Sequence, residues 1–277
     1  LYSACVNESM NELSYPARLA GLNYAVREGY EGIFVDIDGY KESAMSLYEL
    51  ILDHMLEFSI TENQFDAIKD KVVRDYENFS LSDAYMQTRE LAPDLFYETK
   101  YSWKEALPVA KGLSLNAVQE YSRSLYKETF LEALVYGDFA EKDGKKVVDL
   151  FNQKTSTTPI QKEEAFEIKY LSQDKPETIQ YVQKLLVNNS CFFRKYEAGK
   201  DSPETRAILT LMSKAIEQPF YTEMRTNQQL GYIVWSYPRG YDDTYYLNFL
   251  IQSGGYSANE LANRANSFIL KTPSFIR

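Results

Sequence analysis

The stretch Arg225-Thr226-Asn227-Gln228-Gln229-Leu230-Gly231-Tyr232-Ile233-Val234 joins two different patterns. A helical pattern ends in its polar first part, and a strand pattern begins at Gly231. Arg225 and Tyr232 therefore flank a predicted helix–strand junction. A guanidinium, which is always charged, and a phenol hydroxyl at such a corner could both hold a peptide carbonyl. The structural alternative is an arginine that caps the helix end and a tyrosine that belongs to the core.

The sequence around this stretch predicts alternating strands and helices. Ser202-Pro203 is typical of a helix start, because proline is tolerated at the first helical position. After the junction, strands are expected near 231–237 and 244–252, and Ser257 is expected to cap a last helix. Earlier strands are expected at residues 166–171, 178–187 and 191–197, the last two joined by a tight turn at Asn188-Asn189.

The N-terminal half has similar alternation. A strand is predicted over 30–37, ending at Gly39 and followed by an amphipathic helix. Capping boxes at Thr61 and Ser102 indicate two further helix starts. A strand is also expected over Phe130–Tyr136, closed by Gly137-Asp138, with a helix after it that ends near Phe151.

The two halves of the chain resemble each other. A strand leads through Gly39 into a capped helix, and another leads through Gly255 into a second one, 216 residues later. A repeated unit of about 200 residues follows from this pattern. We therefore expect an α+β fold with two related domains, mostly antiparallel sheets and packed helices. The polar, aperiodic stretch 152–164 is the candidate linker, which divides the chain into residues 1–158 and 159–277.

Composition excludes several functions. A net charge of −10 argues against a nucleic-acid partner. No run of apolar residues is long enough for a membrane span. His54 is the sole histidine, so the chain cannot provide the paired imidazoles of a zinc peptidase motif. A serine triad built on His54 would need a Gly-x-Ser-x-Gly nucleophile elbow, and the sequence contains none. Cys5 and Cys191 are too few for a four-cysteine zinc site, and Cys191 in an apolar run is typical of a small buried side chain.

Asp36 and Asp38 are the remaining candidates for chemistry within the chain. Two residues apart on a strand, they lie on the same face, where they could form a metal or acid–base pair. A solvated sheet face explains them as well. The chain also starts without an initiator Met or a signal peptide, and we interpret it as a fragment of a larger protein whose compartment the sequence leaves unknown.

The pattern Arg-Thr-x-x-Gln-Leu-Gly-Tyr at Arg225–Tyr232 resembles the motif in the non-catalytic half of the insulin-degrading enzyme and pitrilysin family, the inverzincin metallopeptidases. The resemblance extends to flanking residues and spans nearly the whole chain. Family-like residues outside the motif are Leu1-Tyr2, Leu19-Ala20-Gly21-Leu22, Gly39-Tyr40, Glu217-Gln218-Pro219-Phe220, Ile233-Val234 and Pro238-Arg239.

This resemblance implies a role. Such enzymes have four similar α+β domains in two halves that close around a chamber, with zinc in the first half. Residues 1–158 would be the later part of the third domain, and 159–277 the earlier part of the fourth. Arg225 would grip substrate backbone, and Tyr232 would donate a hydrogen bond to the carbonyl as it becomes an oxyanion. The chain's partners would be the N-terminal catalytic half, which would hold the zinc, and a peptide substrate.

Two rival functions stay open at this point. The first is a non-catalytic binding or scaffold protein of the same fold, as in processing-peptidase subunits and respiratory core proteins. The intact pair of Arg225 and Tyr232 favours the peptidase. The second is a stand-alone hydrolase that uses Asp36 and Asp38, which would need a metal bound by this chain. Without a zinc motif, we expect the chain to bind no stoichiometric zinc and to be inactive by itself.

Overall fold

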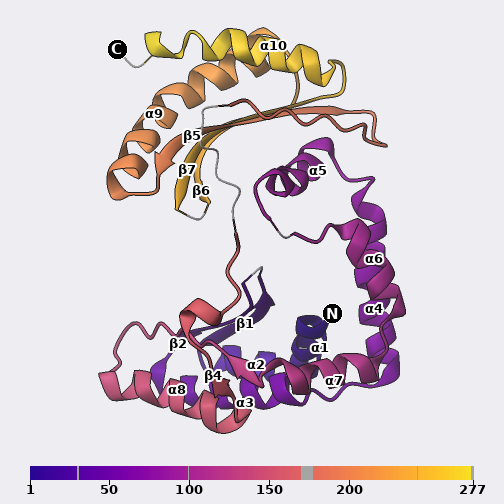
Figure 1. Ribbon diagram of the computed structural model, residues 1–277, viewed down its shortest axis with the longest axis vertical. Helices are drawn as coiled ribbons and strands as arrows, with labels where there is room; N and C mark the ends of the chain where they lie inside the picture. Colours follow the sequence, from indigo (N-terminus) through magenta and orange to yellow (C-terminus); the bar gives the residue numbers. More distant parts are fainter. Residues whose placement is uncertain (30, 99, 170–176, 242, 276–277) are drawn as a thin grey trace. The chain divides into compact units, whose positions relative to one another are not determined.

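A computed structural model of the chain describes all residues except 30, 99, 170–176, 242 and 276–277 (Figure 1). It confirms the predicted α+β fold with antiparallel sheets. The chain forms two compact units. The first contains Leu1–Glu77 and Tyr101–Ile168, and the second contains Asn78–Lys100 and Lys169–Arg277. The sequence division into 1–158 and 159–277 did not foresee that Asn78–Lys100 packs with the C-terminal residues.

The first unit is mostly helical and carries two small pairs of strands. Strands β1 and β2 pair in antiparallel, with Leu22 opposite Gly39, and β3 and β4 pair in parallel. Its helices and strands are α1 Tyr2–Ser9, α2 Asn11–Leu19, β1 Leu22–Glu28, β2 Ile33–Gly39, α3 Lys41–Leu56, α4 Glu62–Phe79, α6 Trp103–Gly112, α7 Leu115–Leu125, β3 Glu128–Thr129, α8 Glu141–Thr155, β4 Thr158–Pro159 and the 3₁₀ turn η2 Lys162–Glu164.

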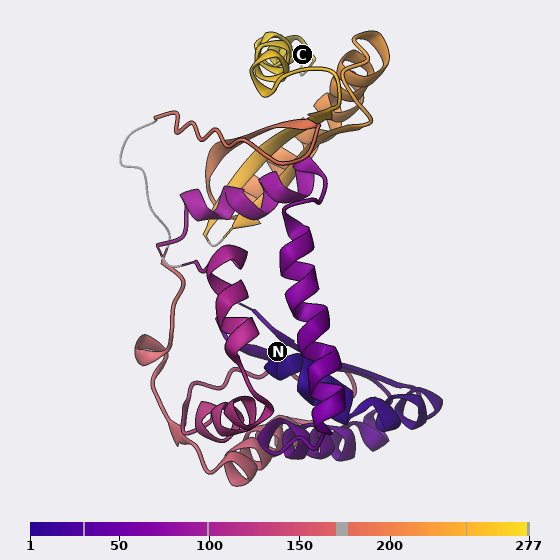
Figure 2. The ribbon, with the colours of Figure 1, turned by 90° about the vertical axis from the view of Figure 1, so that its right-hand side faces the viewer.

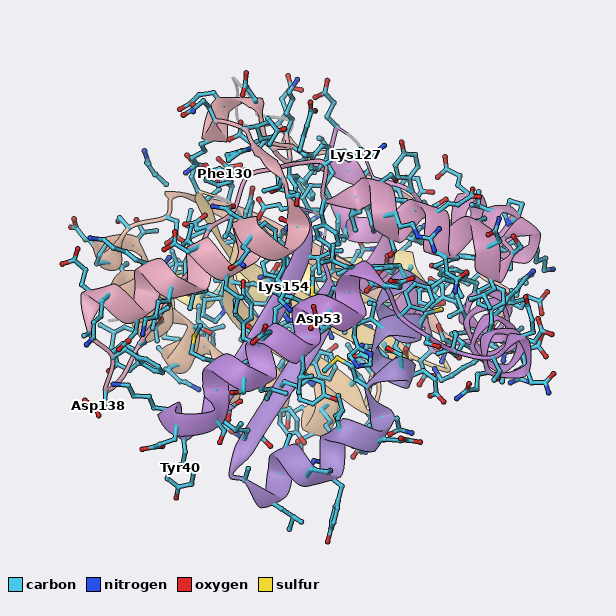
Figure 3. The ribbon with its side chains drawn as sticks, turned by 90° about the horizontal axis from the view of Figure 1, so that it is seen from below. Tyr40, Asp53, Lys127, Phe130, Asp138 and Lys154 are labelled. Carbon is cyan, nitrogen blue, oxygen red and sulfur yellow. The ribbon has the colours of Figure 1, made fainter. Side chains whose placement is uncertain are left out.

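The core of this unit forms where α1, α3 and α4 bring their apolar stripes together. Val6, Ile51, Phe58 and Phe65 are almost completely buried in it. Both predicted capping boxes are present: Gln64 accepts from the N–H of Thr61, and Glu105 from the N–H of Ser102. On the surface, α3 and α8 are linked where Lys154 contacts Asp53 at 2.8 Å (Figure 3).

The second unit is a three-stranded antiparallel sheet in the order β5-β7-β6. Strand β7 is its centre, and the residues of β7 alternate between two covered faces. Its elements are α5 Ala84–Leu91, the 3₁₀ turn η1 Ala92–Leu95, β5 Ser190–Lys200, α9 Pro203–Tyr221, the π-helical turn η3 Thr222–Asn227, β6 Ile233–Tyr241, β7 Thr244–Ser253, α10 Ala258–Ile269 and the 3₁₀ turn η4 Thr272–Ser274.

Helices α9 and α10 cover one face of this sheet, and α5 covers the other (Figure 2). Phe249 and Ile251 of β7 enter the core on the α9 and α10 side. On the other face, the ring of Tyr85 from α5 packs edge-on against Trp235, 5.3 Å between centroids. Helix starts at Ser202 and Ser257 are capped by their side chains, as predicted.

Three predicted strands are not formed among the described residues. Residues 130–136 carry no strand, and pairing stops at Thr129. No strand is present in 166–169 or 177–187, so the predicted hairpin turn at Asn188-Asn189 is also wrong; residues 170 and 171 lie outside the described part. A strand pattern becomes a strand only when a neighbouring strand completes its hydrogen bonds. Among the described residues, no strand pairs with these segments.

The repeat is visible in the order of elements. In the first unit, α2 is followed by the β1–β2 hairpin and then α3, while in the second, α9 and η3 are followed by the β6–β7 hairpin and then α10. That the two units superpose remains a prediction.

Candidate substrate-binding site

The helix–strand junction predicted at Arg225 begins as a π-helical turn. At the end of α9 the backbone widens, and the N–H of Gln228 donates to the carbonyl of Glu223 at 3.0 Å. The N–H of Leu230 reaches Met224 at 2.9 Å. Turns of this kind are rare and often occur at functional sites. Arg225 therefore lies in this widened turn rather than in the regular helix α9.

Buried side chains anchor the two ends of the motif. Met224, Leu230 and Val234 are 0%, 1% and 2% exposed in the core of the second unit. Between them Gln229 adopts a left-handed backbone with φ of 51°. Gly231 then passes so close to β7 that a Cβ atom there would lie 1.8 Å from the carbonyl oxygen of Gln252. The backbone of the motif is therefore set by packing on both sides.

Arg225 and Tyr232 lie next to each other in this frame. The guanidinium carbon of Arg225 is 4.5 Å from the centroid of the Tyr232 ring, in the range of a cation–π contact. Tyr232 is 79% exposed, which rules out the alternative of a core tyrosine. Among the described residues, Arg225 forms no ion pair with a carboxylate. The pair thus combines a half-buried cation with a phenol that is open to solvent.

The sequence analysis missed Tyr221, which holds Arg225 from the other side. Tyr221 lies one helical turn before Arg225, its hydroxyl accepts a hydrogen bond from the Arg225 guanidinium, and its ring centroid is 5.0 Å from the guanidinium carbon. The four-residue spacing on a helix was the signal available in the sequence.

The sequence analysis also missed a set of polar side chains that stabilises the π turn. The carboxylate of Glu223 accepts from the side-chain amides of Asn227 and Gln228, each at 2.8 Å. These two hydrogen bonds lower the pKa of Glu223 below its ordinary value, and the bond from Asn227 has the larger effect. Gln228 also accepts from Arg264 of α10 at 3.3 Å, and Arg264 pairs with Glu260 at 2.7 Å. The π turn is tied to α10 by this chain of polar contacts.

The other candidate residues have structural partners. Asp36 pairs with Arg27 across the β1–β2 hairpin at 2.9 Å, and Asp38 accepts from Asn23 at 2.9 Å. His54 lies on α3 with its Nδ1 atom 2.9 Å from the hydroxyl of Ser9.

Cys5 is buried, whereas Cys191, which the sequence predicted to be buried, is partly exposed. Burial raises the pKa of Cys5 to about 11 and that of Cys191 to about 12, so both are protonated near neutral pH. The described residues contain no group of three or more side chains able to hold a metal ion, and no helix among them could cross a membrane.

Two family matches fall on different parts of the chain. Residues 1–109 match the middle or third domain of peptidase M16, and residues 211–277 match the fourth, C-terminal-lobe domain of the PQQ synthase PqqF-like group. The second match contains the whole junction from Arg225 to Tyr232.

Curated relatives match over nearly the whole chain. Human insulin-degrading enzyme is 26% identical over 98% of it, and the A-factor-processing enzyme of Saccharomyces cerevisiae is 24% identical over 97%. The chain spans 27% and 26% of the length of these two relatives.

Solved structures agree with these matches. Pitrilysin has a TM-score of 0.81 at 19% identity, over 99% of this chain and 29% of its own. A peptidase M16 inactive domain from Pseudomonas fluorescens has a TM-score of 0.58 at 12% identity, covering 99% of this chain and 67% of its own.

Together the fold and the matches define a segment of a zinc metallopeptidase family. The described residues of this segment contain no cluster of metal-binding side chains. The chain belongs to the insulinase and pitrilysin family and comes from its C-terminal region.

Proposed function

We propose that the chain is part of the substrate-holding half of a zinc metalloendopeptidase that degrades peptides inside a closed chamber. The observation that carries the proposal is the contact between half-buried Arg225 and solvent-exposed Tyr232, with 4.5 Å from the guanidinium carbon to the ring centroid, on a backbone set by buried neighbours. A purely structural corner has no need of an exposed tyrosine beside an arginine without a carboxylate partner.

Each side chain has a distinct task in this proposal. Arg225, held in place by Tyr221, donates to a carbonyl of the bound peptide and so fixes its register. Tyr232 donates its hydroxyl hydrogen to the carbonyl oxygen that gains negative charge as the peptide bond is attacked. The zinc of the other half of the protein would polarise that carbonyl and activate water.

The test is steady-state kinetics of the complete enzyme on a short fluorogenic peptide. Tyr232→Phe removes one donor and keeps the ring, so kcat should fall by ~10²–10³. The melting temperature should stay unchanged, because the ring is exposed. Arg225→Ala should also raise KM, since a backbone grip serves the bound substrate and the transition state alike.

The matched control is Tyr101→Phe, at a tyrosine that is 77% exposed in the first unit. It should leave kcat, KM and the melting temperature unchanged. Near-normal turnover of Tyr232→Phe would contradict its role as a donor to the developing oxyanion. Absence of peptide cleavage by the complete protein would favour the rival function, a binding or scaffold protein of the same fold. A fall in activity that follows a fall in melting temperature would assign Tyr232 a structural role.

A further inference from the structure

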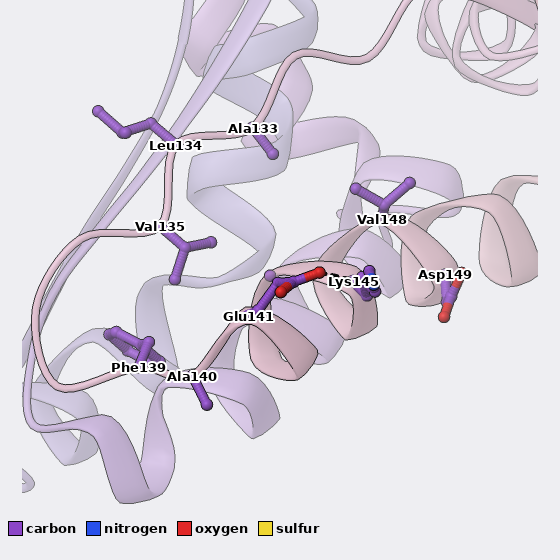
Figure 4. A pocket seen from close by; sticks show the side chains of 10 residues that line it. Ala133, Leu134, Val135, Phe139, Ala140, Glu141, Lys145, Val148 and Asp149 are labelled. Carbon is purple, nitrogen blue, oxygen red and sulfur yellow. Dashed lines mark ion pairs between the residues drawn. The ribbon is translucent and has the colours of Figure 1, made fainter.

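Lysines in this chain differ in whether a carboxylate neutralises them. A hollow of about 620 Å³ in the first unit contains the common case, with Glu141 and Lys145 of α8 on its wall (Figure 4). The side chains of these two residues form an ion pair at 2.7 Å. Lys195 of the second unit has different surroundings.

Lys195 of β5 carries an ammonium group that lies among aromatic rings. Its Nζ atom is 4.4 Å from the ring centroid of Phe96, 3.7 Å from that of Tyr241 and 4.3 Å from that of Tyr246. The residue is half-buried, and within the described part of the chain its ammonium forms neither an ion pair nor a hydrogen bond. Ring faces attract a cation. They also displace the water that would accept its hydrogen bonds, and they supply no oxygen in its place.

Two exposed arginines add positive charge near this lysine. The guanidinium carbon of Arg239, on β6, is 5.1 Å from the centroid of the Tyr241 ring, which Lys195 also contacts. Arg89 of α5 and Arg239 both act on Tyr237: burial raises the pKa of its phenol, and the two positive charges oppose the rise. Among the described residues, neither arginine pairs with a carboxylate. An anion that reaches this surface therefore meets charge that is not neutralised, although the chain has a net charge of −10.

These surroundings make Lys195 less basic than an ordinary lysine. An ammonium that has lost its water and lies near a like charge releases its proton more readily. Burial, and after it the charge of Arg239, lowers the pKa of Lys195 from 10.5 to about 8. A larger share of neutral amine is therefore present near neutral pH, and the neutral amine is the nucleophilic form.

We propose that Lys195 is an acylation site whose donors are acyl phosphates. The Nζ lone pair attacks the carbonyl carbon of the donor, the bond from that carbon to the phosphate oxygen breaks, and phosphate leaves with the electron pair. The proton lost from Nζ goes to solvent, and the products are an amide and inorganic phosphate. Arg239 and Arg89 attract the anionic donor. The amide is uncharged, so acylation removes an unneutralised cation from beside Arg239.

Acetylation of the complete protein by acetyl phosphate at pH 7.5 tests the proposal, with the initial rate at each lysine measured by mass spectrometry. Lys195 should react on the order of 10-fold faster than Lys71 and Lys145, since a neutral fraction about 200-fold larger is partly offset by the weaker nucleophilicity of a less basic amine. Lys71 and Lys145 are exposed and paired with carboxylates. The rate at Lys195 should level off above about pH 8. A rate at Lys195 no higher than at these two lysines would overturn the proposal.

Two substitutions separate the aromatic surroundings from the attraction of the donor. Phe96→Ala admits water to the ammonium, so the rate at Lys195 should fall several-fold. Arg239→Gln should lower the rate with acetyl phosphate more than the rate with phenyl acetate, an uncharged donor. Arg74→Gln, at an exposed position on α4, is the control and should change neither rate.

Melting temperatures show whether each variant is folded. An unchanged rate at Lys195 in folded Phe96→Ala would contradict the role of the rings. Equal effects of Arg239→Gln on the two donors would contradict the preference for phosphate-bearing donors. The pH profile of the original protein still decides the matter if Phe96→Ala does not fold, because a rate that keeps rising well above pH 8 would contradict the proposal.

Discussion

Gly231 determines how closely the motif approaches the sheet. Its missing side chain leaves room for the carbonyl of Gln252, which a Cβ atom would meet at 1.8 Å. The contact is to backbone of the central strand β7, so it cannot be relieved by turning a side chain. The close contact between Gly231 and Gln252 therefore sets the position of the residues that follow, including Tyr232.

We predict that Gly231→Ala destabilises the chain by about 1–3 kcal/mol, because the backbone must shift in a packed region. The matched control is Gly254→Ala, where a Cβ atom would have nothing within 4 Å. Urea unfolding of both variants measures the difference. Equal midpoints for the two variants would show that the approach to Gln252 is not constrained.

The hydrogen bonds to Glu223 should make the stability of the π turn depend on pH. Its pKa is lowered by hydrogen bonds from Asn227 and Gln228, so its carboxylate form stabilises the fold. A group with a lowered folded pKa contributes stability above its ordinary value of 4.5, and that contribution is lost as the pH falls through the folded pKa.

We predict that Glu223→Gln lowers the melting temperature slightly at pH 7. The difference in melting temperature between the variant and the original chain should vanish well below pH 4.5. Melts over a pH series measure this. Glu217→Gln on the exposed surface of α9 is the comparison. If the melting-temperature difference between Glu223→Gln and the original chain grows toward acid pH, the role given to the Glu223 carboxylate is wrong.

At the scale of elements, α5 depends on the sheet for its first turn. The N–H of Tyr85 donates to the side chain of Gln252 at 2.8 Å, and the N–H of Ala84 to that of Asn189 at 3.3 Å. These acceptors are far away in the sequence, so the helix is capped by tertiary contacts rather than by a preceding residue.

We predict that Gln252→Ala costs about 0.5–2 kcal/mol, as does the loss of an ordinary helix cap. Amides of α5 should exchange faster in the variant, while those of α10 should not. Gln183→Ala, at an exposed position in the second unit, serves as the control and should leave both helices unchanged.

At the scale of the whole molecule, the proposed peptidase function requires ligands for zinc. His54 is the sole histidine, and the described residues offer no cluster of metal ligands. The chain spans about a quarter of the length of its curated relatives, so peptide hydrolysis is a property proposed for the complete protein.

The purified 277-residue chain should accordingly contain far less than one zinc per molecule after dialysis, and it should cleave no fluorogenic peptide. Metal analysis and a peptidase assay check this. One tightly held zinc per chain would contradict the assignment of zinc to another part of the protein.

Sequence patterns were reliable where their causes are local. The capping boxes at Thr61 and Ser102 depend on neighbouring residues and were predicted correctly, as were the strands near 231–237 and 244–252. The strand pattern at Phe130–Tyr136 was misleading, because a strand exists only with a partner, and the described residues supply none.

The sequence by itself determined the α+β class, the family resemblance and the two side chains of the candidate site, because periodicity and a motif are properties of residue order. Tertiary structure alone decided that Asn78–Lys100 packs with the second unit and that Tyr221 holds Arg225. It also decided that Tyr232 faces solvent beside that arginine. Burial and contact depend on which distant segments meet, and that choice is made by packing of the whole chain rather than by any local pattern.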